Sequence, residues 1–258
     1  MPAHVRDVLS YLDTTLEIDR FRDYAPNGLQ IAGVPEIETV VTGVSASAAL
    51  LERAIELDAD LVIVHHGLIW GGGIGRIEGP LARRLKLLLS HDMGLAAYHL
   101  PLDKHARLGN NVGLAEAIGL VGEHTWFGDV RGVALGLAGA FAAPLSREQA
   151  VNQIGAGVCG GEPPRFVFPH GPEVVRRVGL CTGAASDLLE DAARAGCDLF
   201  VTGELAERAG ELARELQITL VAAGHYATEV FGPMRLAAEL RKEFPQLAVS
   251  FLSMPCPL

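Results

Sequence analysis

The run Leu61-Val62-Ile63-Val64 is wholly apolar, and two histidines, His65 and His66, follow it directly. A short apolar run without alternation is typical of a strand that is covered on both faces, as in the parallel sheets of α/β proteins. Two adjacent imidazoles at the end of such a strand are poor packing groups but good metal ligands. This segment therefore predicts an α/β fold and a functional site at the end of one strand.

Strand-like runs alternate with helix-like segments along the 258 residues of the chain. Such alternation predicts an α/β fold whose sheet is largely parallel. The helix-like segments are Val5 to Leu16, Ala48 to Leu57 and Leu81 to Leu89, and the other strand-like runs are Val40 to Val44 and Leu95 to Tyr98.

We expect two similar α/β lobes, residues 1–125 and residues 126–258. The stretch 122–172 is rich in Gly and Pro, and we expect it to bridge the lobes and to add edge strands. It holds a strand-like run, Val133 to Phe141, and then a helix that begins near Ser146, a good N-cap residue. Nothing in this stretch indicates chemistry.

The second half of the chain resembles the first. At an offset of 138 residues (188 − 50), six positions are identical: 50/188, 51/189, 52/190, 54/192, 60/198 and 61/199. At an offset of 126 (225 − 99), His99 aligns with His225 and Asp103 aligns with Glu229. These matches predict an internal duplication, with polar residues at the strand ends lining a cleft between the halves. The alternative is a chance similarity between two ordinary βα units.

Five side chains of the chain are candidate metal ligands: His65, His66, Asp103, His225 and Glu229. Five such groups are more than one ion usually takes from a protein, so the sequence predicts a site for two. Imidazole and carboxylate ligands suit zinc, iron and manganese. A helical turn after the strand would put His225 and Glu229 on one face. Pro101, between His99 and Asp103, instead favours an extended or turn backbone there.

The other polar residues are weaker candidates for a functional role. The remaining histidines, His4, His91, His105, His124 and His170, are expected to be ordinary surface or core residues. In Thr202-Gly203-Glu204, Thr202 could cap a helix with Glu204 in its first turn, or Glu204 could lie in the cleft. Glu204 and His99 are the candidates for moving protons during a reaction.

Charge and composition exclude several classes of protein. The formal net charge is −10 (21 − 31) and the chain has no basic run, so nucleic-acid binding is not expected. The longest apolar stretch, Val133 to Ala143, is much shorter than the ~18 residues of a membrane span. The first residues lack a signal-peptide core, and the four cysteines form no Cys-x-x-Cys pair. We therefore expect a soluble, cytoplasmic protein without a disulfide or zinc framework.

Six motifs, in order, resemble those of the Nif-three-like dinuclear metal family, whose members are often described as GTP cyclohydrolase 1 type 2 homologues. The motifs are Pro26-Asn27-Gly28-Leu29-Gln30, Val64-His65-His66-Gly67, Tyr98-His99-Leu100-Pro101-Leu102-Asp103, Gly109-Asn110-Asn111, Thr202-Gly203-Glu204 and Gly224-His225-Tyr226-Ala227-Thr228-Glu229. The resemblance implies a two-lobed α/β fold and a toroidal homohexamer, a trimer of dimers. It also implies His65, His66, Asp103 and His225 as terminal ligands and Glu229 as the bridging ligand of two metal ions.

The functional hypothesis that follows is a dinuclear metal-dependent hydrolase of a small molecule. The family resemblance adds GTP as a candidate substrate, although the chain has no P-loop and no triphosphate-binding cluster. The basic residues nearest to the motifs are Arg83, Arg84, Lys86 and Lys104, which are the candidates for contacting a phosphate. The alternative is a non-enzymatic hexamer that binds metal and acts through partners or in metal homeostasis.

Overall fold

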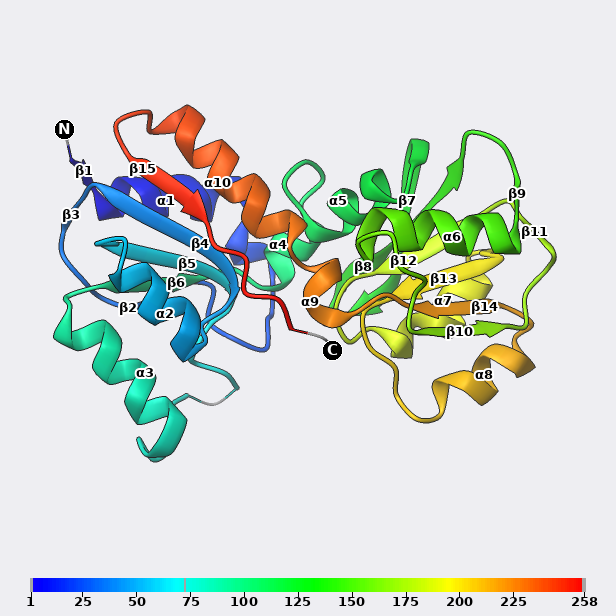
Figure 1. The fold of residues 1–258 in the computed structure, drawn as a ribbon, viewed down its shortest axis with the longest axis horizontal. Helices are drawn as coiled ribbons and strands as arrows, with labels where there is room; N and C mark the ends of the chain where they lie inside the picture. The colour runs from blue at the N-terminus through cyan, green and yellow to red at the C-terminus, as the bar shows by residue number, and fades with distance from the viewer. Residues whose placement is uncertain (1, 72, 257–258) are drawn as a thin grey trace. The chain divides into compact units, whose positions relative to one another are not determined.

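The chain builds two units, each around its own β-sheet (Figure 1). The computed structural model describes residues 2–71 and 73–256. The first unit holds the residues up to Leu102 together with Gly232–Met254, and the second holds Asp103–Phe231 and the chain from Pro255 onward. This division differs from the boundary expected near residue 125, because the chain leaves the first unit earlier and returns to it near its end.

The first unit contains a five-stranded sheet in the order β15-β4-β5-β6-β2. Strands β15, β4, β5 and β6 are parallel, and β2 is antiparallel at the edge. The strands are β2 (Gly28–Ile31), β4 (Thr39–Ser45), β5 (Leu61–His66), β6 (Gly94–Ala97) and β15 (Ala248–Phe251), with a small separate pair, β1 (Ala3–His4) and β3 (Glu36–Ile37).

Helices cover both faces of this sheet (Figure 1). They are α1 (Val5–Thr15), α2 (Ala48–Ile55), α3 (Gly79–Ser90) and α10 (Phe231–Glu243), with the 3₁₀ turn η1 (Ile18–Arg20). Helices α2 and α3 pack on one face through Leu50, Leu51 and Leu88. On the other face, Thr42 of β4 donates a hydrogen bond to the carbonyl of Pro233 in α10. Coverage of both faces explains why β5 is apolar throughout its first four residues.

The second unit contains a six-stranded mixed sheet in the order β10-β14-β13-β12-β8-β7. Its strands are β7 (Leu120–Val130), β8 (Val133–Phe141), β10 (Phe166–Pro169), β12 (Val178–Cys181), β13 (Leu199–Thr202) and β14 (Thr219–Ala222), with a small pair, β9 (Leu145–Ser146) and β11 (Val174–Val175). Strands β12, β13 and β14 are parallel, whereas β7, β8 and β10 are antiparallel to their neighbours. The expectation of a largely parallel sheet is therefore confirmed for the first unit and wrong for the second.

Helices cover this second sheet as well. They are α5 (Asn110–Ala117), α6 (Arg147–Val158), α7 (Leu189–Arg194), α8 (Ala209–Glu215) and α9 (His225–Thr228), with the 3₁₀ turn η2 (Ser186–Leu188), and α4 (Leu100–Lys104) carries the chain out of the first unit. Helices α5 and α6 share a core with β8, β12, β13 and β14. Ser146 begins α6 with a capping box to Gln149, as the sequence predicts. The stretch 122–172 supplies antiparallel strands at both edges of the sheet, which accounts for its mixed character.

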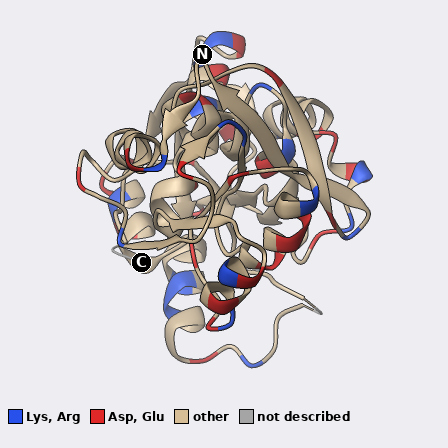
Figure 2. Ribbon diagram, turned by 90° about the vertical axis from the view of Figure 1, so that its right-hand side faces the viewer, with Lys and Arg blue, Asp and Glu red and all other residues tan. Residues whose placement is uncertain are grey.

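Charged residues of both signs are interspersed over the ribbon (Figure 2). Several arginines are paired with carboxylates, for example Arg194 with Glu190 and Asp191, and Arg83 with Glu52. Within the described residues, no helix is long and apolar enough to cross a membrane.

Candidate metal centre

The first unit brings three histidines together at the carboxyl end of its sheet. His65 and His66 end β5, and His99 follows β6. One ring nitrogen of each lies within 4.8 Å of one ring nitrogen of the other two. His65 is fully buried, and the other two are half-buried. The sequence singled out all three residues, and the structure places them in one cluster.

Each ring of this cluster is held in the same way, through Nδ1. That atom lies within hydrogen-bond distance of an oxygen of the protein: the Tyr98 carbonyl for His65 (2.9 Å), Ser45 Oγ for His66 (3.1 Å) and Asp23 Oδ1 for His99 (2.7 Å). The bond to the Tyr98 carbonyl requires a proton on Nδ1 of His65, because a carbonyl can only accept. A neutral ring then carries its lone pair on Nε2, the arrangement that metal-binding histidines use.

Asp23 organises the segment around His99. Its side chain, 2% exposed, accepts hydrogen bonds from Asn27 Nδ2 (3.0 Å) and from the backbone N–H of Leu100 (2.8 Å) as well as contacting His99. Asn27 in turn accepts the backbone N–H of His99. Burial raises the pKa of Asp23, but hydrogen bonding and charge at His99 outweigh it, so the pKa lies below the ordinary value. Asp23 lies outside the recognised motifs, and sequence reasoning missed it.

Gln30 fixes the loop that follows the histidine pair. Its Oε1 accepts the backbone N–H groups of Leu68 (2.8 Å) and Ile69 (3.1 Å). A Cβ at Gly67 would lie 2.3 Å from the same oxygen, so only glycine allows this close approach. The motif that contains Asn27 and Gln30 thus supports His99 and the loop after His66.

The second unit places His225, Glu229 and Glu204 side by side. His225 begins α9 directly after β14, and its Nε2 lies 3.0 Å from Glu229 Oε2. Its Nδ1 lies 2.6 Å from Glu204 Oε1. Burial lowers the pKa of His225, but the hydrogen bonds and charges of Glu229 and Glu204 outweigh this effect. Together they raise the pKa from 6.5 to about 9. The segment does turn helical after the strand, and the turn brings the His225 and Glu229 side chains together.

Glu204 reaches His225 from a loop. Thr202 ends β13, and the next helix, α8, begins only at Ala209. The Thr202 hydroxyl donates to the carbonyl of Gly183 (3.0 Å) instead of capping a helix. The reading of this motif as a helix N-terminus is therefore wrong.

Asp103 is buried in the second unit and held by two donors. Asn110 Nδ2 (2.9 Å) and Thr182 Oγ1 (3.2 Å) both donate to its Oδ1. The backbone here is helical in α4, so the extended or turn backbone that Pro101 was expected to favour is not found. Pro101 is the second residue of the helix, where a backbone N–H has no partner within the helix and its loss costs little.

Gly183 makes room for the carboxylate of Glu229. Its φ is +67°, and a Cβ there would lie 2.2 Å from Glu229 Oε1 and 3.3 Å from His225 Nε2. A carboxylate oxygen of Asp103 lies within 4.8 Å of one of Glu229. The second unit therefore gathers two buried carboxylates and an imidazole, and the absence of a side chain at Gly183 leaves room for the Glu229 carboxylate.

The donor types of both units suit a divalent metal ion. In the first unit, the imidazoles of His65, His66 and His99 lie close enough together to hold one, and the second unit offers an imidazole and two buried carboxylates. Nitrogen and oxygen donors of this kind suit zinc, iron and manganese. His225, like the three histidines of the first unit, has an oxygen atom of the protein within hydrogen-bond distance of Nδ1. Hydrogen bonds of this kind are what orient metal-binding histidines in proteins.

Several histidines that were expected to be ordinary residues, and Lys104, have local contacts. His4 accepts the backbone N–H of Arg6 at the start of α1, His91 contacts the Leu87 carbonyl, and His105 accepts the N–H of Leu108. Lys104 donates to the Ala134 carbonyl and lies over the Trp126 ring. These contacts favour structural over ligand-binding roles for the residues concerned.

Comparison with known proteins adds independent support. The model of the family Duf34/NIF3 (NGG1p interacting factor 3) matches residues 3–257. A GTP cyclohydrolase 1 type 2 homolog of Yersinia pestis is 41% identical over 252 residues, 95% of this chain and 96% of that protein. Another, of Escherichia coli (strain K12), is 43% identical over 235 residues, 91% and 92% of the two chains.

A solved structure agrees with these relatives. Protein ybgI, of unknown function, superimposes with a TM-score of 0.90 at 39% identity, over 99% of this chain and 100% of that one. The family resemblance expected from the sequence motifs is thereby confirmed. The chain belongs to the Duf34/NIF3 (NGG1p interacting factor 3) family.

Proposed function

We propose that the chain binds two divalent metal ions through His65, His66, Asp103, His225 and Glu229 and uses them to hydrolyse a small molecule. One observation carries the proposal: the Nδ1 atoms of the three histidines in this set, His65, His66 and His225, all lie at protein oxygens. A histidine held in this way directs Nε2 to a metal ion. Glu229, a buried carboxylate next to Asp103 and His225, is the residue suited to bridge two ions.

Two bound ions would supply a water molecule of lowered pKa and would stabilise negative charge that develops on the substrate. The residues of the chain provide the rest. Glu204 is assigned to proton transfer because its side chain is 48% exposed and is bonded to His225. His99, oriented by Asp23, is the second candidate for this task on the side of the first unit.

Metal content tests the first half of the proposal. Purified protein reloaded with zinc, iron or manganese is expected to hold about two ions per chain by elemental analysis. His65→Ala and His225→Ala should each lose metal, whereas His91→Ala, a histidine bonded to its own helix, should keep it. A wild-type protein that binds no metal after reloading would refute the site.

Turnover tests the second half. The loaded protein is assayed against a panel of phosphoesters, amides and purine compounds, and the names of the relatives place GTP in that panel. Glu229→Ala should abolish any activity found. Metal binding without turnover on the panel would favour the alternative, a metal-binding protein that acts through partners or in metal homeostasis.

The family resemblance extends the proposal to the assembly. We propose a cytoplasmic homohexamer, a trimer of dimers, as the working form. Sedimentation velocity of the purified protein checks the mass directly, and a monomer at micromolar concentration would contradict it.

A further inference from the structure

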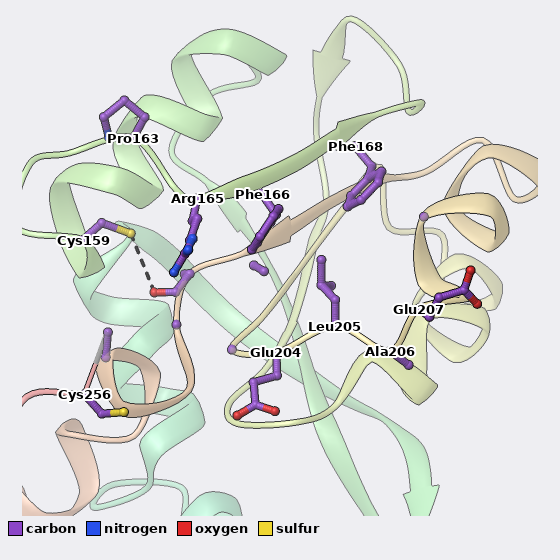
Figure 3. A pocket seen from close by; sticks show the side chains of 16 residues that line it. Cys159, Pro163, Arg165, Phe166, Phe168, Glu204, Leu205, Ala206, Glu207 and Cys256 are labelled. Carbon is purple, nitrogen blue, oxygen red and sulfur yellow. Dashed lines mark hydrogen bonds between the residues drawn. The ribbon is translucent and has the colours of Figure 1, made fainter. Parts of the chain in front are cut away.

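A cavity of about 680 Å³ lies in the second unit, beside Glu204 (Figure 3). It is lined by Gly203, by Ala222 at the end of β14 and by the two residues that follow, Ala223 and Gly224. Clefts at the carboxyl ends of parallel strands are the usual place for ligands in α/β sheets. The cavity therefore has both the size and the location of a small-molecule site.

The stretch 122–172 supplies the most distinctive side chains of this cavity. Phe166 and Phe168 of β10 present aromatic rings to it, and Leu205 adds an apolar contact from the loop after β13 (Figure 3). Phe166 is 50% exposed. Large apolar side chains that line a hollow and remain in contact with water favour a ligand with a flat apolar surface.

Positive and negative side chains lie on different sides of the cavity. Arg165 and Glu207 lie on opposite sides of it, and Glu204 lies along its lower edge (Figure 3). The Arg165 guanidinium lies 5.7 Å from the centroid of the Phe166 ring. No side-chain hydrogen bond or ion pair joins Arg165 to another residue that the structure describes. A planar cation beside an aromatic ring is suited to an anionic group attached to a flat ring.

Glu204 connects the cavity with the candidate metal ligands. The same carboxylate that lines the cavity contacts His225 Nδ1 at 2.6 Å. Gly224, which also lines the cavity, directly precedes His225 in the chain. A molecule held in the cavity would therefore lie next to a residue of the proposed metal centre.

We infer that this cavity binds the substrate, a planar aromatic or heteroaromatic compound that carries an anionic group. The ring lies against Phe166, Phe168 and Leu205, the anion contacts Arg165, and hydrogen-bond donors of the ring face Glu204. This inference rests on the proposed hydrolase function, whose substrate class it specifies. The carboxylates of Glu204 and Glu207 repel the anion and so fix the direction in which the compound binds.

The test uses 1-naphthalenesulfonate, which has a flat ring and an anion but no bond for hydrolysis, and its uncharged analogue 1-naphthalenesulfonamide. Binding to the full-length, metal-loaded protein is followed by fluorescence and calorimetry. The sulfonate should bind more tightly than the sulfonamide. Arg165→Ala should weaken the sulfonate about tenfold, the usual size of a lost charge-assisted contact, and remove the preference.

Matched variants make the result specific. Arg165→Lys should retain part of the preference, and Arg176→Ala, an exposed arginine outside the cavity, should change nothing. Phe166→Ser should weaken both probes. Arg165 and Phe166 are exposed, so these variants are expected to fold.

Cys256 gives an internal reporter of occupancy. It lines the cavity and is exposed, whereas Cys181 and Cys197 are buried and Cys159 is half-buried. A thiol reagent should label Cys256 rapidly in the protein alone and slowly in the presence of the sulfonate.

Three results would overturn the inference: equal affinity for both probes, unchanged binding in Arg165→Ala, or Cys256 labelling that the sulfonate does not slow. The metal content of the same samples is measured in parallel. Failure of the cavity with two ions bound is thus distinguished from failure of the metal site itself.

Discussion

Glu204 Oε1 lies 2.6 Å from Nδ1 of His225, while Nε2 of the same ring lies 3.0 Å from Glu229. One imidazole is therefore held between two carboxylates that arrive from different segments of the chain. Glu229 is nearly fully buried and Glu204 is half-exposed, so the two contacts differ in their surroundings. This arrangement separates a carboxylate that could bind metal from one that orients the ring.

Removal of Glu204 should weaken metal binding without destroying the site. Glu204→Ala leaves His225 Nδ1 without its oxygen partner, and loss of such a partner typically lowers metal affinity by roughly 10–100-fold. Glu204→Gln, which keeps an oxygen acceptor, should lose less. Competition against a fluorescent chelator measures both. Glu207→Ala, another carboxylate of the cavity, serves as the control, and an equal loss in that variant would contradict a specific role for Glu204.

Gly183→Ala should abolish metal binding by displacing Glu229. The new Cβ would lie 2.2 Å from Glu229 Oε1, a distance that requires the carboxylate to move. Gly196→Ala is a closely matched control, because Gly196 has a similar φ of +76° and open space where a Cβ would lie. Both variants carry the backbone strain of about 1 kcal/mol, and only Gly183→Ala carries the clash.

Elemental analysis after reloading, together with urea unfolding, separates these two effects. Gly196→Ala should be slightly less stable and hold its full metal content. A Gly183→Ala protein with two ions per chain would show that Glu229 is not a ligand, or that it relocates without loss.

Sequence reasoning located strands β4, β5 and β6 of the first sheet and β8 of the second. Strand β5 could be predicted because a short apolar run without alternation is typical of a strand covered on both faces. The start of α6 could be predicted because its capping box, between Ser146 and Gln149, involves residues only three positions apart. The mixed sheet of the second unit was missed. Strand β7 is largely exposed and carries no clear apolar period, so only its pairing with β8 reveals it.

The ligand candidates could be named because imidazole and carboxylate groups at strand ends are chemically conspicuous. Their supports could not, since Asp23 and His99 are 76 residues apart and meet only through the fold. Likewise, Arg165 and Phe166 look like ordinary loop residues until β10 pairs with β14 and both residues come to line the same cavity as Glu204. Contacts of long sequence separation carry no local signal.

Asp23→Ala should destabilise the protein in a manner that depends on pH. The change leaves the buried donors of Leu100 and Asn27 without their acceptor, which costs about 3 kcal/mol. The pKa of Asp23 is lowered from 3.8 in the folded state, so its stabilising contribution is present above that pH and is lost as the pH falls through the folded value.

Urea unfolding of the wild type and the variant, repeated from pH 7 to pH 3, checks this dependence. The difference in unfolding free energy should shrink on the acid side. Asp187→Ala removes an exposed carboxylate and should change stability by no more than about 0.5 kcal/mol. A difference that stays constant with pH would show that the charge of Asp23 is not what stabilises the segment.

Metal binding at neutral pH should release a proton from His225. The pKa of this residue is raised from 6.5 to about 9 without metal, so the metal-free protein carries the proton at pH 7.5, whereas a metal ion needs the neutral ring. Apparent affinity should therefore rise by about tenfold per pH unit until the pH reaches the folded pKa. Conversely, the stability that the protonated ring gives the metal-free protein is fully present below pH 6.5 and disappears as the pH rises through about 9.

Calorimetric titration with zinc in two buffers of different ionisation enthalpy counts the protons released from His225. The Glu204→Gln variant, which removes one of the two charges that raise this pKa, should release fewer protons. Heats that are independent of the buffer would exclude His225 as a protonated ligand.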